Sequence, residues 1–193
     1  MRTAAVILAA GFSRRMRQED KLKLCVGGVP LYRRAIALAC SCGLFSTVLV
    51  VTNQADIAAF AGQNGAQAVE NPLAERGMGT SVAAGTRALP ADTAFCAFLN
   101  ADQPFLTADI LRRLVQAAQA ENKIAVPRVD GVPKSPCVFP QRYFAQCKAL
   151  SADQGGKGIY RQHEDDVVWV AFPDGRAWRD IDTPADYSAM CSG

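Results

Sequence analysis

The chain has 193 residues, of which 50% are hydrophobic and 20% are charged, and its formal net charge is +3 at pH 7. These values are typical of a soluble globular protein, and we expect residues 1–193 to form a single domain. The weak positive charge does not favour a nucleic-acid partner, and no run approaches the roughly twenty apolar residues of a membrane helix. We therefore expect neither nucleic acid nor a membrane among the partners.

The first predicted element is a strand from Thr3 to Leu8, which ends in three consecutive apolar residues. Such a run is typical of a parallel strand that is buried on both faces. Arg2 followed by apolar residues could also begin a secretion signal. Because Gly11 interrupts the run without a longer apolar core behind it, we interpret it as a strand.

The segment from Leu8 to Lys21 has the residues of a phosphate-binding loop. Gly11 allows a tight turn whose backbone N–H groups approach an anion, and the Ser13 hydroxyl adds a donor. Arg15 can bind phosphate oxygens in a bidentate manner, and Lys21 adds a compact charge. The loop therefore predicts a bound triphosphate, and the alternative is a strand end followed by a solvated basic turn. Neither of the two common glycine-rich nucleotide motifs follows this strand.

Strands and helices alternate along the rest of the chain, which predicts a sheet covered by helices. Pro30 can open a helix that ends near Gly43, and Thr107 can cap another that reaches about Ala120. The remaining predicted strands are 45–51, 66–69 and 94–99, and the remaining predicted helices are 56–62 and 79–89.

Two acidic positions are candidate metal ligands. Asp102 follows the buried strand 94–99, and a carboxylate at such a strand end is costly unless a cation compensates it. Ligands of open α/β sheets bind outside the carboxyl ends of strands, so Asp102 should face the same crevice as Gly11. Mg²⁺ is often held by one or two carboxylates together with phosphate oxygens. Asp182 is a possible second ligand, and its alternative role is that of a plain helix-entry aspartate.

The cysteines give an expectation about the cellular compartment. The chain has 7 of them, an odd number, and they lie in apolar segments without C-x-x-C pairing. Reduced core cysteines of this kind are typical of a cytoplasmic protein. We therefore predict a cytoplasmic location and no zinc site.

Four segments, taken in order, resemble the molybdenum cofactor cytidylyltransferases and related nucleotidyltransferases. They are the loop 8–21, the stretch 71–85 with its Asn71-Pro72 and Gly77-Met78 pairs, the turn Asp102-Gln103-Pro104, and the closing 180–184. The resemblance implies a Rossmann-like, three-layer α/β/α nucleotidyltransferase fold with a mostly parallel sheet and a small β extension.

The resemblance also implies an activity. In such enzymes a phosphate of the molybdopterin cofactor attacks the α-phosphorus of CTP, pyrophosphate leaves, and molybdopterin cytosine dinucleotide is formed. Mg²⁺ would be the metal, with Mn²⁺ as an alternative, and a molybdoenzyme or its chaperone would receive the product. The alternatives are a transferase that uses GTP or another phosphorylated acceptor, and a non-catalytic protein that binds nucleotide and cofactor.

The resemblance implies roles for individual residues. Arg15, Lys21 and Asp102 would be catalytic, and Asp102 and Asp182 would hold the metal. The nucleotide would contact the first loop and the segment before and within the helix 79–89, at Leu8, Ala9, Ala10, Gly11, Ser13, Gly77, Ser81 and Gly85. Ala10 favours CTP, because guanylyl relatives commonly carry a glycine there.

Some positions depart from the family pattern. Arg17 stands where relatives usually have glycine, and Lys134-Ser135-Pro136 stands where cytidylyltransferases tend to have Gly-His-Pro. The second departure lies on the acceptor side in similar enzymes, so it bears on the identity of the acceptor. Lys157 either binds acceptor phosphate or merely begins a helix.

Overall fold

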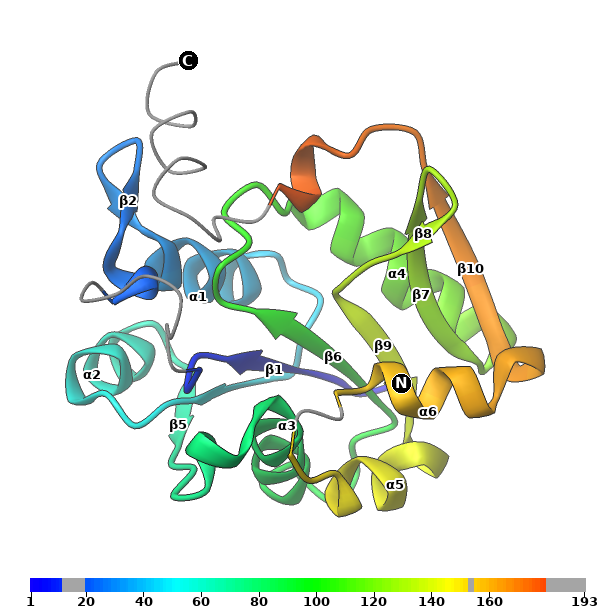
Figure 1. The fold of residues 1–193 in the computed structure, drawn as a ribbon, viewed down its shortest axis with the longest axis horizontal. Helices are drawn as coiled ribbons and strands as arrows, with labels where there is room; N and C mark the ends of the chain where they lie inside the picture. The colour runs from blue at the N-terminus through cyan, green and yellow to red at the C-terminus, as the bar shows by residue number, and fades with distance from the viewer. Residues whose placement is uncertain (12–19, 153–154, 180–193) are drawn as a thin grey trace.

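The computed structural model describes residues 1–11, 20–152 and 155–179. A mixed β-sheet forms its centre (Figure 1). In spatial order the strands are β10 (Val167–Phe172), β7 (Ile124–Val129), β9 (Cys137–Pro140), β6 (Phe95–Asn100), β1 (Thr3–Leu8), β4 (Thr47–Val51) and β5 (Gln67–Val69), and β8 (Val132–Pro133) pairs with β7. Neighbouring strands are parallel except that β9 runs antiparallel to β6 and β7, and β8 antiparallel to β7. The predicted α/β fold with a mostly parallel sheet is confirmed.

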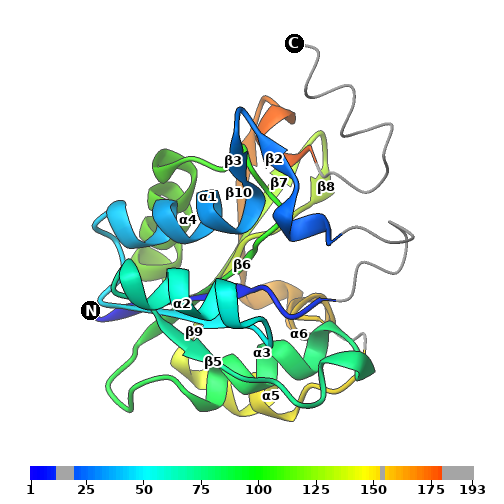
Figure 2. The same ribbon diagram turned by 90° about the vertical axis from the view of Figure 1, so that its left-hand side faces the viewer.

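Helices pack on both faces of the sheet, and Figure 2 shows α1 and α4 on one side with α3 and α5 on the other. The bounds are α1 (Leu31–Ser41), α2 (Ala55–Gln63), α3 (Met78–Arg87), α4 (Ala108–Glu121), α5 (Phe144–Ala149) and α6 (Lys157–Gln162). One core cluster joins α1, α2 and α4 to the sheet, and a second joins α3, α5 and α6 to it. Alternation along β1 explains both clusters, because Ile7 packs in the first and Val6 in the second.

Local signals predicted the longer helices and strands from β1 to α4 closely. The strand β1 has the predicted bounds, and α1 begins directly after Pro30. The predicted cap of α4 is present, because Thr107 Oγ1 accepts a hydrogen bond from Ile110 N at 3.4 Å. The predicted strand 45–51 begins at Thr47 instead, because Ser46 N bonds to Thr3 O outside the regular ladder. Such one- or two-residue differences are ordinary at element ends.

A short hairpin lies between the first loop and α1. It is formed by β2 (Cys25–Val26) and β3 (Val29–Pro30), which make a separate two-stranded sheet. The 3-10 helix η1 (Lys21–Lys23) precedes it, and Asp20 caps η1 by accepting a hydrogen bond from Leu22 N at 3.1 Å. Leu22 is buried, so this small unit is anchored in the core.

Among the described residues, none of the helices has both the length and the apolar character that a membrane crossing needs.

Candidate active site

The carboxyl ends of β1 and β6 bring the two predicted centres of chemistry together. The two strands are parallel neighbours, with Leu8 opposite Asn100. Beyond the ladder, Ala101 N donates to Leu8 O at 3.2 Å, and Ala9 N donates to Val51 O at 2.9 Å. The chain segments that lead to Gly11 and Asp102 therefore leave the same edge of the sheet, as the strand pattern predicts.

An ion pair joins this edge to the helix η1. Lys21 Nζ lies 2.8 Å from Asp102 Oδ2, and the two side chains are only 12% and 28% exposed. Partial exclusion from water strengthens such an interaction relative to a surface pair. Lys21 is held in place because the adjacent Leu22 is buried and Asp20 caps the same helical turn. Two of the three predicted catalytic residues are thus in direct contact.

The second oxygen of Asp102 is buried without a partner. Among the described residues, no group donates a hydrogen bond to Asp102 Oδ1. A buried acceptor in this state costs about 1–3 kcal/mol, which is the cost that a bound cation or ligand donor would remove. A hard divalent cation such as Mg²⁺ prefers carboxylate oxygen, so Asp102 is suited to hold one.

The described residues supply few other acidic ligands at this place. No group of three or more His, Cys, Asp or Glu side chains within residues 1–11, 20–152 and 155–179 is arranged to hold a metal ion. The predicted partner ligand Asp182 lies outside the described residues, as do Ser13 and Arg15. Their roles remain predictions.

A hydrogen-bond network shapes the segment 71–81. Asn71 is buried, and its Nδ2 donates to Thr80 Oγ1 and to Ser81 Oγ, both at 2.9 Å. Its Oδ1 accepts from Leu73 N at 3.1 Å, and its backbone exchanges two hydrogen bonds with the side chain of Asn53. One asparagine thus ties the turn after β5 to the first turn of α3.

The other predicted nucleotide contacts differ in their surroundings. Gly77 has φ +119° and begins α3, a backbone conformation that side-chain-bearing residues rarely adopt. Ser81 is buried within the Asn71 network. Gly85 packs against the sheet, where an added Cβ would lie 2.4 Å from Val6 Cγ1. Its lack of a side chain therefore has a packing cause, and its contact with nucleotide remains a prediction.

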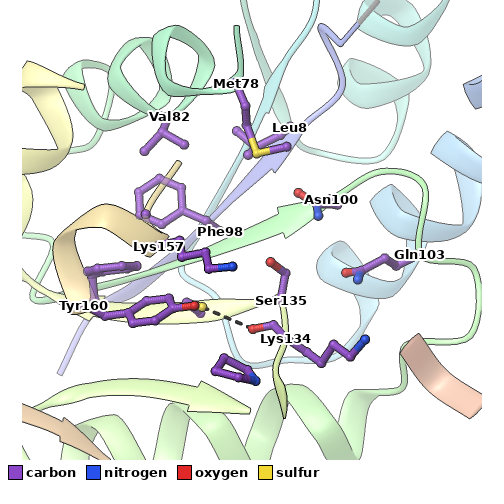
Figure 3. Close-up of a pocket in the computed structure, with 14 residues that line it drawn as sticks. Leu8, Met78, Val82, Phe98, Asn100, Gln103, Lys134, Ser135, Lys157 and Tyr160 are labelled. Carbon is purple, nitrogen blue, oxygen red and sulfur yellow. Dashed lines mark hydrogen bonds between the residues drawn. The ribbon is translucent and has the colours of Figure 1, made fainter. Parts of the chain in front are cut away.

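A cavity of about 250 Å³ opens beside this edge of the sheet (Figure 3). Its lining comes from β1, α3, β6 and the turn after it, the segment 133–139, and α6 with the residue before it. The lining residues are Leu8, Met78, Val82, Phe98, Asn100, Gln103, Pro133, Lys134, Ser135, Cys137, Phe139, Gly156, Lys157 and Tyr160. Three aromatic rings form an apolar wall, and Lys134 and Lys157 are the charged groups of this lining. The cavity is therefore suited to a partly apolar molecule that carries negative charge.

The Cys137 thiol and the Tyr160 phenol of the cavity wall are neutral near pH 7. Burial raises the pKa of the Cys137 thiol to about 12. Burial, with a smaller contribution from Cys137, raises the pKa of Tyr160 to about 12. Neither group supplies an anionic nucleophile at neutral pH. The nucleophile of a reaction at this cavity would therefore belong to the substrate.

The sequence assigns no separate role to two residues of the site. It includes Gln103 only within the turn Asp102-Gln103-Pro104, and Asn71 only within the stretch 71–85. The adjacency of Gln103 to a strand-end carboxylate was an available signal. The packing of the 133–139 segment beside α6 had no local signal, because those residues meet only through the sheet.

The fold and the match to a family model identify the chain as a nucleotidyltransferase. The chain belongs to the MobA-like NTP transferase domain family, whose model matches residues 5–167. No curated protein sequence matches the chain.

Solved structures with the same fold include Rv0371c from Mycobacterium tuberculosis H37Rv, with a TM-score of 0.82 and 23% identity over 100% of this chain and 98% of that one. The same protein has also been solved in complex with manganese, with a TM-score of 0.76 and 21% identity over 100% of both chains. A nucleotidyl transferase from Methanothermobacter has a TM-score of 0.81 and 18% identity over 99% of this chain and 96% of that one. A CMP:2-keto-3-deoxy-manno-octonic acid synthetase complexed with CTP has a TM-score of 0.75 and 12% identity over 100% and 98%.

Proposed function

We propose that this chain transfers CMP from CTP to the phosphate of the molybdopterin cofactor and releases pyrophosphate. An oxygen of the acceptor phosphate bonds to the α-phosphorus of CTP, and the bond from that phosphorus to the β-phosphate bridging oxygen breaks. The observation that carries the proposal is the contact between Lys21 and Asp102 at 2.8 Å, beside the end of β1. Positioning and charge neutralisation account for most of the rate of such a reaction.

The metal and the cations have separate roles in this proposal. Asp102, with its unpaired Oδ1, and Asp182 would hold Mg²⁺ or Mn²⁺. When bound, the metal neutralises phosphate charge and orients the triphosphate. Lys21 and Arg15 stabilise the charge that develops on the departing pyrophosphate. Leu8, Ala9, Ala10, Gly11, Ser13, Gly77 and Ser81 would contact the nucleotide, and Ala10 favours CTP over GTP.

The acceptor would occupy the cavity beside the strand edge. The charge of the cavity lining supports this placement. Lys134 and Lys157 line the cavity, and neither forms an ion pair within the described chain, so both can interact with a phosphate of the acceptor. Lys134 is half-buried, and its backbone N donates to Pro127 O at 2.9 Å, so the segment that carries it is held against β7. A phosphorylated and partly apolar acceptor fits these surroundings.

Calorimetry and a product assay test the proposal. The titrations use CTP, GTP, ATP and UTP, each with Mg²⁺, and pyrophosphate release is then followed after purified molybdenum cofactor is added. We expect selective CTP binding and cofactor-dependent release. Nucleotide binding without release would move the acceptor to another phosphorylated molecule, and the absence of any nucleotide binding would contradict a transferase role.

A further inference from the structure

Gln103 occupies an unusual position between the catalytic edge and the cavity. It follows Asp102 directly, it is only 5% exposed, and it lines the cavity. Figure 3 shows its carboxamide pointing toward the cavity, on the side where Asn100, Ser135 and Lys134 are drawn. Its side chain therefore points into the cavity that the proposed acceptor would occupy.

The carboxamide oxygen of Gln103 is buried and has no partner in the part of the chain that the structure describes. Among the described residues, no donor reaches Oε1. By contrast, the carboxamide of Gln119 on α4 is tied into the protein, because its Nε2 donates to Thr3 Oγ1 at 2.9 Å. A buried acceptor without a donor destabilises the free protein, and an apolar residue of the same size would avoid that cost.

A hydrogen-bond donor of the ligand would satisfy this oxygen. The cations of the cavity lining, Lys134 and Lys157, make no hydrogen bond to Gln103 Oε1. A site that is built to bond an N–H or O–H group discriminates strongly against a molecule that lacks it, because its buried polar atom then stays unpaired. The unpaired oxygen therefore indicates that the substrate must donate a hydrogen bond to it.

We propose that Gln103 selects the acceptor by accepting a hydrogen bond from one of its N–H or O–H groups. The acceptor is then a phosphorylated molecule with an N–H or O–H group that can reach Gln103 Oε1. A phosphorylated molecule whose remaining part is entirely apolar would be a poor acceptor. This inference rests on the proposed transfer reaction and adds a specificity-determining residue to it.

The variant Gln103→Met tests the proposal, because methionine has a similar shape and lacks polar atoms. In pyrophosphate-release assays with CTP, Mg²⁺ and purified molybdenum cofactor, we expect the acceptor KM to rise about 10- to 100-fold, as the loss of a buried hydrogen bond predicts. The affinity for CTP, measured by calorimetry, should stay within about twofold. The melting temperature of the free protein should equal or exceed that of the wild type, because an unpaired buried group has been removed.

Gln119→Met is the matched control. It should lower the melting temperature, because Thr3 Oγ1 loses its partner inside the protein, and it should leave the acceptor KM unchanged. An unchanged acceptor KM in Gln103→Met, or an equal loss of CTP affinity, would overturn the assignment to the acceptor. If the wild type itself shows no turnover with the cofactor, the proposed function fails. The stability measurement tests the premise separately: a lower melting temperature in Gln103→Met overturns the inference, because Oε1 would then have a partner in the free protein, and an equal or higher one supports the premise that it has none.

Discussion

Lys21 Nζ and Asp102 Oδ2 lie 2.8 Å apart although 81 positions separate them along the chain. One comes from the 3-10 helix after the first loop, and the other follows the strand next to β1. The contact pairs a cation with a carboxylate whose other oxygen is buried and unpaired within the described chain. This arrangement concentrates both signs of charge where a metal and a polyphosphate would meet.

Asp102→Asn should reduce turnover by about 10²- to 10³-fold, because the amide cannot supply the charge that holds a divalent metal. Pyrophosphate release measured across a Mg²⁺ titration checks this, and chelation of the metal should abolish release by the wild type. Asp92→Asn is the control, since Asp92 pairs with Arg2 at 2.5 Å on the exposed surface. Wild-type turnover in Asp102→Asn would remove this residue from the mechanism.

Lys21→Met should lower turnover by a similar factor, because the departing pyrophosphate loses a stabilising charge. Lys23→Met, on the same helical turn, should leave turnover unchanged, because Lys23 pairs with the exposed Asp56 at 2.9 Å. The effects of Lys21→Met and Asp102→Asn should not multiply, since residues in contact act as a unit. A double variant whose loss equals the product of the two single losses would show that they act independently.

Gly85→Ala should destabilise the protein by about 1–3 kcal/mol, because the new Cβ would lie 2.4 Å from Val6 Cγ1 and force the helix away from the sheet. Gly62→Ala is the matched control in α2, where nothing lies within 4 Å of an added Cβ. There the substitution should stabilise by about 0.4–1 kcal/mol. Urea unfolding measures both changes, and equal stability of the two variants would contradict the packing explanation.

Asn71→Ala should lower the unfolding free energy by at least about 2 kcal/mol, because Thr80, Ser81 and Leu73 each lose a partner. The segment before α3 should also lose its shape, so we expect weaker CTP binding in calorimetry. Asn64→Ala, at an exposed helix end where Nδ2 donates to Phe60 O, should change both quantities little. Unaltered CTP affinity in Asn71→Ala would separate the network from nucleotide binding.

Asp166 should give a pH-dependent contribution to stability. Burial by itself raises the pKa of Asp166, but hydrogen bonds donated by Tyr143 and Arg142 outweigh it and hold the pKa below the ordinary 3.8. A lowered folded-state pKa adds stability that is fully present above the ordinary value and is lost as the pH falls through the folded value.

Asp166→Asn should therefore be less stable than the wild type at pH 7, by no more than about 1 kcal/mol because water screens this half-exposed pair. The difference should shrink once the pH drops below 3.8. Urea unfolding between pH 3 and pH 7 measures it. Asp165→Asn should show no such gap, because Asp165 is exposed and its backbone oxygen, not its side chain, accepts a hydrogen bond from Lys123 Nζ. A constant difference across this range would argue against the ion pair as its cause.

The sequence by itself determined the elements that depend on neighbours in the chain. Consecutive apolar residues define β1, Thr107 caps α4, and Pro30 precedes α1, since these signals act over one or two turns of backbone. The alternation of strands and helices also made it predictable that Asp102 would face the same crevice as the first loop, because ligands of open α/β sheets bind outside the carboxyl ends of the strands.

Only the tertiary structure decided how the later part of the chain completes the cavity. The reversed strand β9 lies between β6 and β7, with Cys137 opposite Phe98, and this pairing brings Lys134 and Ser135 to the cavity that Gln103 also lines. Lys157 reaches the same place from α6. These contacts join residues tens of positions apart, and their free energy comes from side chains that meet only once the sheet has formed, so no local pattern encodes them.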